Sequence, residues 1–187
     1  MKKGGIGGAK TQKAGADFEA STAEDLIQKL VKQGYKITDE HRLSGSKSTL
    51  HGVSLISPKK NSLEIYYQDG IYKLFFEPRG VNWRKHFSAR LKPDSAIYSE
   101  ATKTLTIIEK KQQETSGSVA EKLQTCDYKM LYYSKLVAGM GIKVELVWQL
   151  GQYFVDQEAN LKSIFEYMVS KGSRHYFLTI PIEELNI

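Results

Sequence analysis

The chain has 187 residues, of which 41% are hydrophobic, and a formal net charge of +6. This size and composition suit a single globular domain with a sizeable core. No apolar run reaches the roughly 18 to 20 residues that a membrane helix needs, and no apolar stretch follows the first lysines, so neither a membrane protein nor a secretory signal is expected. The basic surplus favours phosphate-rich partners without identifying one.

The cysteine and histidine content limits the cellular environment and the kind of metal site that are expected. The single cysteine, Cys126, excludes an internal disulfide and indicates a reducing environment, which predicts a cytoplasmic protein. The four histidines lie far apart without ligand-like spacing, so a zinc site is not expected. We expect residues 1–14, which are rich in glycine and lysine, to form a flexible basic arm, and residues 15–187 to form one domain.

The first half of the chain predicts one helix followed by several strands. A helix is expected over residues 17–33, ending at Gly34, and a strand over residues 35–43. Strands over residues 63–68 and 71–77 flank Asp69-Gly70, a dipeptide typical of a two-residue hairpin turn. A basic connector over residues 79–92 leads to two more strands, over residues 96–99 and 104–111, which a short polar turn joins.

The second half predicts a long helix over about residues 118–138, because apolar side chains recur there at spacings of three and four. A strand over residues 143–148 follows, and Asp156 is expected to cap a last amphipathic helix that runs to Val169. This order of elements predicts an α/β fold, with a mixed sheet flanked by helices.

Charged residues end the core strand Thr104–Lys111. Side chains alternate across a strand, so Glu109 and Lys111 share one face and Lys110 lies on the other. Asp94 precedes the strand over residues 96–99, and the hairpin that joins the two strands should bring Asp94 back opposite Glu109 and Lys111.

Two carboxylates and a lysine at adjacent strand ends suit metal-assisted hydrolysis of a phosphodiester. Carboxylate oxygens are ligands for Mg²⁺, which lowers the pKa of a bound water and neutralises charge on the phosphate. The lysine can orient or deprotonate the attacking water and contact the phosphate. The alternative is a surface cluster of salt bridges at a sheet edge.

Pro93-Asp94 followed by Glu109-Lys110-Lys111 resembles the signature of the PD-(D/E)XK nuclease superfamily. The resemblance implies a restriction-endonuclease-like core, Mg²⁺ as cofactor, Asp94, Glu109 and Lys111 as catalytic residues, and Asp94 and Glu109 as metal ligands. Many members carry an early helix whose glutamate reaches the metal, which here implies Glu19. The alternative for Glu19 is a first-turn acid that stabilises the helix dipole.

Five basic residues are candidates for binding the DNA backbone. The connector brings Arg84, Lys85 and Arg90 up to Asp94, and such charges would hold phosphates without reading sequence. Superfamily members often lay the helix after the Lys111 strand near DNA, which implies Lys122 and Lys129, on the face away from the apolar stripe. A solvated helix face is the alternative for these two lysines.

No helix-turn-helix or zinc module is evident in the sequence. The whole chain resembles the small, cleavage-only subunit of heterodimeric type IIS restriction endonucleases, whose large subunit recognises DNA and cuts the other strand. The resemblance implies double-stranded DNA and a larger DNA-recognising endonuclease subunit as partners. Two alternatives stay open: a homodimeric Holliday-junction resolvase or repair nuclease of the same superfamily, and a non-catalytic DNA-binding protein with the same fold.

Overall fold

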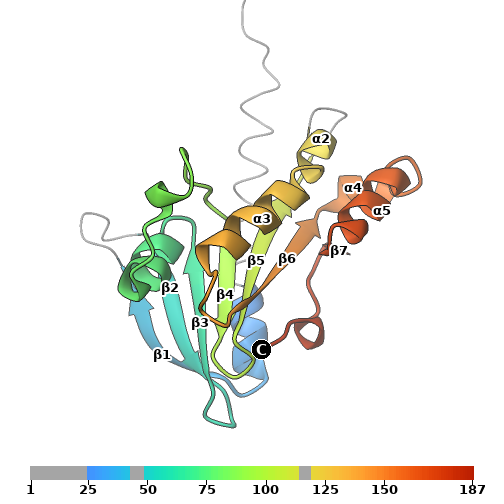
Figure 1. Cartoon of the computed structure of the whole chain (residues 1–187). Helices are drawn as coiled ribbons and strands as arrows, with labels where there is room; N and C mark the ends of the chain where they lie inside the picture. Colours follow the sequence, from blue (N-terminus) through green and yellow to red (C-terminus); the bar gives the residue numbers. More distant parts are fainter. Residues whose placement is uncertain (1–24, 43–48, 114–118) are drawn as a thin grey trace, which may run out of the picture.

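The computed structural model describes residues 25–42, 49–113 and 119–187. Within these residues, seven strands form one sheet in which each strand lies beside its sequence neighbours (Figure 1). The strands are β1 (Lys36–His41), β2 (Gly52–Ile56), β3 (Ser62–Tyr67), β4 (Ser95–Ser99), β5 (Thr104–Lys111), β6 (Lys143–Leu150) and β7 (Ser173–Phe177). Neighbours from β1 to β5 pair antiparallel, whereas β5–β6 and β6–β7 pair parallel.

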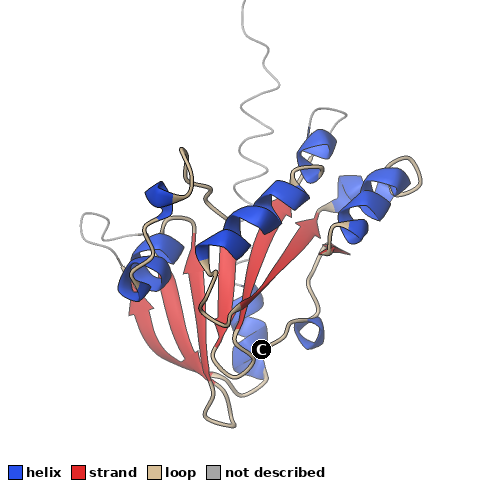
Figure 2. Ribbon diagram, in the orientation of Figure 1, coloured by secondary structure: helices blue, strands red, loops and turns tan. Residues whose placement is uncertain are grey.

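Helices cover both faces of this sheet (Figure 2). One face carries the π-helix η1 (Ile71–Phe76), α2 (Val119–Leu123), α3 (Cys126–Leu136), α4 (Gln152–Asp156) and α5 (Lys162–Ser170). A helix over residues 25–32 and the C-terminal segment with the 3-10 helix η4 (Ile182–Glu184) cover the other face. The predicted α/β class, with a mixed sheet flanked by helices, is therefore confirmed.

Strand β5 lies inside the sheet and is buried on both faces. Leu105 and Ile107 pack into the core beneath α3, and Ile108 packs into the core beneath the helix over residues 25–32. This alternation is the period-2 pattern of a strand between two helical layers. The bounds of β5 are those expected from the sequence, so the charged end of β5 emerges directly from the core.

The hairpin predicted at Asp69-Gly70 is wrong. Residues 71–77 do not form a strand, because β3 already pairs with β2 on one edge and β4 on the other. The chain instead enters η1, which buries four aromatic and aliphatic side chains, followed by the 3-10 helix η2 (Glu77–Arg79). Gly70 has an ordinary helical φ of -56°. Glycine is required there because a Cβ would lie 1.9 Å from the carbonyl oxygen of His51.

Other elements also differ from expectation in number and in bounds. The helix expected over residues 118–138 is two helices, α2 and α3. The predicted capping role of Asp156 is wrong, because Asp156 ends α4 and the last helix, α5, begins at Lys162 after Leu161. Strands β2 and β7 were not predicted. The expected arm over residues 1–14, and the first part of the helix expected over residues 17–33, lie outside the described residues. None of the helices in the described ranges is long and apolar enough to cross a membrane.

Candidate functional site

The β4–β5 hairpin brings two acids together at one end of the sheet. Ser95 pairs with Ile108 in the antiparallel register, so continuing the register by one residue places Asp94 beside Glu109. This is the juxtaposition that the hairpin length predicts. The parallel register on the other side of β5 sets Trp148 of β6 beside Glu109.

Both acids contact the same ammonium group. Lys111 Nζ lies 3.2 Å from Asp94 Oδ2 and 3.4 Å from Glu109 Oε2. Two main-chain groups complete the arrangement: the amide of Lys110 donates to Asp94 Oδ2 at 2.6 Å, and Lys111 Nζ donates to the carbonyl oxygen of Lys110 at 2.7 Å. The structure thus gathers the three residues expected from the sequence around one point.

Lys129 joins this cluster, although the sequence suggested a different place for it. The alternative of a solvated helix face is wrong for Lys129, whereas its expected contact with DNA stays a prediction. Its Nζ lies 2.6 Å from Glu109 Oε1, and its side chain is 16% exposed. Helix α3 crosses the end of β5, and this position directs the Lys129 side chain toward the sheet rather than toward solvent.

The cluster is mostly withdrawn from solvent. The Glu109 side chain is only 3% exposed, and the Lys111 side chain is 21% exposed. The ring of Trp148 lies beneath both ammonium groups, with its centroid 5.9 Å from Lys111 Nζ and 5.8 Å from Lys129 Nζ. Removing one partner of a buried ion pair costs about 3–5 kcal/mol, so these groups also hold the strand end together. Cation–π contact adds to their stabilisation.

Tyrosines hold the segment that carries Asp94. The hydroxyls of Tyr72 and Tyr133 both donate to the carbonyl oxygen of Leu91, three residues before Asp94. Burial raises the pKa of Tyr133 well above its usual value, so this hydroxyl stays protonated and remains a donor. These tyrosines come from η1 and α3, and no local motif in the sequence links them to Asp94.

Lys110 points to the opposite face of the sheet, as strand alternation predicts. Its side chain lines a cavity of about 10 Å³ together with Ser95, Gln149 and residues of the helix over residues 25–32. Its main-chain amide and carbonyl, rather than its ammonium group, take part in the acid cluster. Glu19, the further metal ligand that the resemblance implies, lies outside the described residues.

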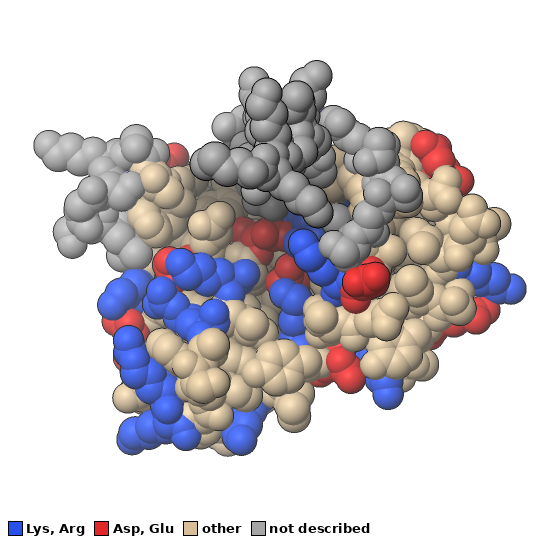
Figure 3. Space-filling view, turned by 90° about the horizontal axis from the view of Figure 1, so that it is seen from above, with Lys and Arg blue, Asp and Glu red and all other residues tan. Residues whose placement is uncertain are grey.

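The candidate DNA-binding cations differ in solvent exposure and in whether they form ion pairs. Arg84, Lys85 and Lys122 are exposed, whereas Arg90 forms an ion pair with Asp69 at 2.6 Å. Lys92 also contacts Asp69, at 2.5 Å. Seen from above, down onto the end of the sheet where β5 ends, acidic and basic side chains lie next to each other near the centre, and further basic side chains gather to one side (Figure 3).

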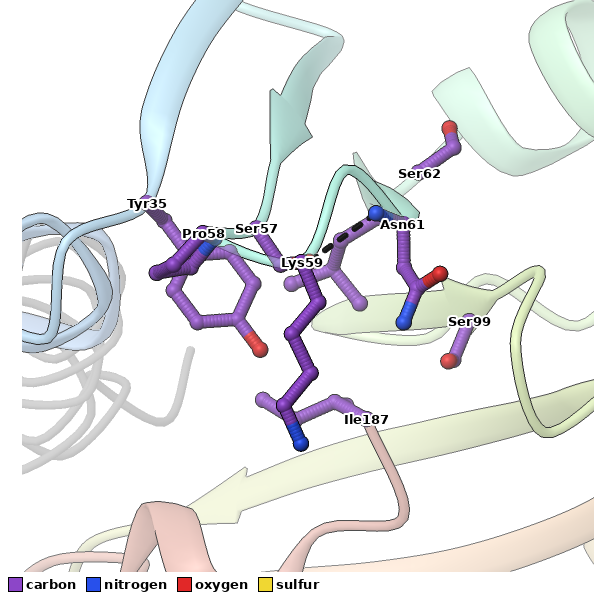
Figure 4. Close-up of a pocket in the computed structure, with 9 residues that line it drawn as sticks. Tyr35, Ser57, Pro58, Lys59, Asn61, Ser62, Ser99 and Ile187 are labelled. Carbon is purple, nitrogen blue, oxygen red and sulfur yellow. Dashed lines mark hydrogen bonds between the residues drawn. The ribbon is translucent and has the colours of Figure 1, made fainter.

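A larger cavity than the one beside Lys110 lies elsewhere in the described residues. It measures about 250 Å³ and is lined by Tyr35, Ser57, Pro58, Lys59, Asn61, Ser62, Leu63, Ser99 and Ile187 (Figure 4). Ser99 pairs with Thr104 at the start of β5, so this cavity lies at the opposite end of the sheet from Glu109. Its lining contains one lysine and no acidic side chain. The acid cluster, rather than this cavity, is therefore the candidate functional site.

The cluster suits a divalent cation in the nature and number of its donors. No group of three or more histidine, cysteine, aspartate or glutamate side chains that could hold a metal occurs within the described residues. Mg²⁺ does not need such a cage, because it commonly keeps several waters and binds through one or two carboxylates plus substrate phosphates. Asp94 and Glu109 supply two carboxylates whose oxygens already flank a positive charge at Lys111 Nζ.

No protein-family model matches the chain, and no curated protein matches it.

Proposed function

We propose that the chain is a Mg²⁺-dependent DNA endonuclease that hydrolyses phosphodiester bonds at Asp94, Glu109 and Lys111. The observation that carries this proposal is the shared contact of two carboxylates with one ammonium at a mostly buried strand end. This combination of hard oxygen ligands and a lysine is the one that metal-assisted phosphoryl chemistry needs. The resemblance of Pro93-Asp94 and Glu109-Lys110-Lys111 to PD-(D/E)XK nucleases supports it, as does the α/β sheet.

Each residue then has a distinct role. Asp94 and Glu109 would hold Mg²⁺, which supplies an acidified water and neutralises charge on the phosphate when bound. Lys111 orients the attacking water and contacts the scissile phosphate. Trp148 forms an apolar floor beneath the lysines, which limits water around the charges and strengthens their interactions.

We further propose that the chain is the cleavage-only subunit of a heterodimeric type IIS restriction enzyme, acting in the cytoplasm on one strand of a DNA duplex. The helix over residues 25–32 packs on the sheet through Leu30, and α2 packs on it through Leu123. Helices α3, α4 and α5 also pack on the sheet. The described part of the chain therefore leaves no spare helix to read a major groove. A larger subunit that recognises DNA would supply the missing sequence information.

The test is cleavage of plasmid DNA in Mg²⁺, with the larger subunit supplied, by the wild-type chain and by the Asp94→Asn and Glu109→Gln variants. We expect each variant to lose at least about 10²-fold in rate, because weaker Mg²⁺ binding removes several kcal/mol of stabilisation of transition-state charge. Glu166→Gln, which alters an exposed acid on α5, should cut like the wild type. Circular dichroism checks that each variant is folded.

Other outcomes would point to other functions. Wild-type rates from Asp94→Asn or Glu109→Gln would refute the assigned site. Resolution of four-way junctions by the chain alone would favour a homodimeric resolvase. DNA binding without cleavage in any combination, unchanged by Asp94→Asn, would favour a non-catalytic protein.

A further inference from the structure

Lys129 contacts the candidate metal site in a way that differs from Lys111. Lys111 is tied to Asp94, to Glu109 and to its own neighbouring carbonyl. Among the described residues, Lys129 Nζ has a single hydrogen-bond partner, Glu109 Oε1 at 2.6 Å. Lys129 also comes from α3 rather than from the sheet, so its long side chain can change rotamer without a shift of the β5 main chain.

Among the described residues, the formal charges of the four side chains in this cluster sum to zero when no metal is bound. Asp94 and Glu109 carry two negative charges, and Lys111 and Lys129 carry two positive charges at distances of 2.6 to 3.4 Å. Both Glu109 oxygens are already occupied, Oε2 by Lys111 and Oε1 by Lys129. A divalent cation that binds Glu109 must therefore displace an ammonium group or tolerate its repulsion at close range.

We propose that Lys129 is an internal competitor for the metal, which holds Glu109 until a DNA phosphate draws its ammonium away. The inference rests on the proposed function, since it assumes that Glu109 is a metal ligand. Lys129 then couples the two ligands: phosphate binding to Lys129 frees Glu109 for Mg²⁺, and Mg²⁺ binding to Glu109 frees Lys129 for the phosphate. Such coupling is reciprocal by thermodynamic necessity. It favours metal loading at the site when DNA is in place.

The test measures Mn²⁺ affinity of the full chain without DNA by electron paramagnetic resonance, so it does not depend on cleavage. We expect Lys129→Met to bind Mn²⁺ about 5- to 150-fold more tightly than the wild type, the usual range of coupling between two sites. Lys129→Arg, which keeps the charge, should bind like the wild type. Lys135→Met is the matched control, because Lys135 lies on the same helix with its Nζ over Phe87 rather than at Glu109.

A cleavage-resistant phosphorothioate duplex supplies the second arm. It should raise the Mn²⁺ affinity of the wild-type chain and have a much smaller effect on Lys129→Met, in which Glu109 is already free of Lys129. If Lys129→Met does not fold, Lys129→Gln carries the same test, since its amide keeps a donor near Glu109 without the charge.

The outcomes separate this inference from the proposed function. Equal or weaker Mn²⁺ binding by Lys129→Met, together with loss of binding in Glu109→Gln, would overturn the role of Lys129 and leave the metal site intact. Mn²⁺ binding that is unaffected by Glu109→Gln would remove the metal site itself, and the inference with it.

Discussion

The main-chain amide of Lys110 donates a 2.6 Å hydrogen bond to the carboxylate of Asp94. Asp94 lies just before β4, whereas Lys110 lies on β5 between the two residues whose side chains face Asp94. The strand that carries Glu109 and Lys111 therefore also orients Asp94. A charge-assisted bond of this kind is stronger and geometrically more specific than a neutral one, so the two acids are held in one fixed relation.

This arrangement predicts that Lys111 and Lys110 differ sharply in their effect on cleavage. Lys111→Ala should lower the cleavage rate about 10²- to 10⁴-fold, the usual loss when a group that activates or positions a nucleophile is removed. Lys110→Met should keep the rate within a few-fold of wild type, because its side chain lies on the opposite face and methionine preserves the apolar stem. Single-turnover cleavage in the presence of the larger subunit measures both. A larger loss in Lys110→Met would show that the wrong face of β5 had been assigned to catalysis.

The isolated chain should cut ordinary duplex DNA poorly and at no fixed site. Backbone contacts alone give non-specific binding with a Kd of about 10⁻⁴–10⁻⁶ M at physiological salt, and such contacts carry no sequence information. A partner bound at its own recognition site raises the effective concentration of the chain near one phosphate. Plasmid digestion by the purified chain, with and without the larger subunit, tests this. Discrete fragments from the chain alone would contradict the cleavage-only assignment.

The exposed cations of the connector should contribute to DNA affinity through salt-dependent interactions with phosphates. We expect the double variant Arg84→Ala/Lys85→Ala to reduce the slope of log K against log salt by about 0.9 for each phosphate that the variant no longer neutralises. Lys59→Ala/Lys60→Ala is the control, because these exposed lysines lie at the end of the sheet remote from Glu109. Fluorescence anisotropy with a labelled duplex over a range of salt gives both slopes. An equal change of slope in the two variants would mean that the connector has no special part in binding.

His175 should make the stability of the fold depend on pH. Burial lowers the pKa of His175 below its ordinary value of 6.5, although the charge of Glu158 opposes the shift. At this residue the folded state then binds fewer protons than the unfolded state, so the contribution of His175 to the free energy of unfolding is greatest above pH 6.5 and falls as pH drops from there towards the lowered pKa. His175→Phe keeps an aromatic ring against Phe165 and should flatten this dependence.

Urea unfolding at pH 7.5 and pH 5.5 measures the effect of His175. The wild type should lose more stability between the two pH values than His175→Phe. His86→Gln, which alters an exposed histidine, should behave like the wild type. The same loss in wild type and His175→Phe would show that other groups govern the pH dependence.

The sequence alone determined the central part of the candidate site. Alternation along Thr104–Lys111 separated Lys111 from Lys110, and the short turn after β4 required an antiparallel hairpin that returns Asp94 to Glu109. These features depend on contacts close in sequence, where strand period and turn length leave few choices. The α/β class followed for the same reason, from the order of local patterns.

The surroundings of that site depend on packing between segments that are distant in the sequence. Residues 71–77 have the composition of a strand, but β2 and β4 already occupy both edges of β3, so the segment becomes helical. Lys129 looks like a surface residue of its helix, yet the position of α3 over β5 turns its ammonium onto Glu109. Trp148 reaches the site through the parallel pairing of β5 with β6. These contacts depend on pairing and packing between segments that are distant in sequence, so local sequence patterns do not predict them.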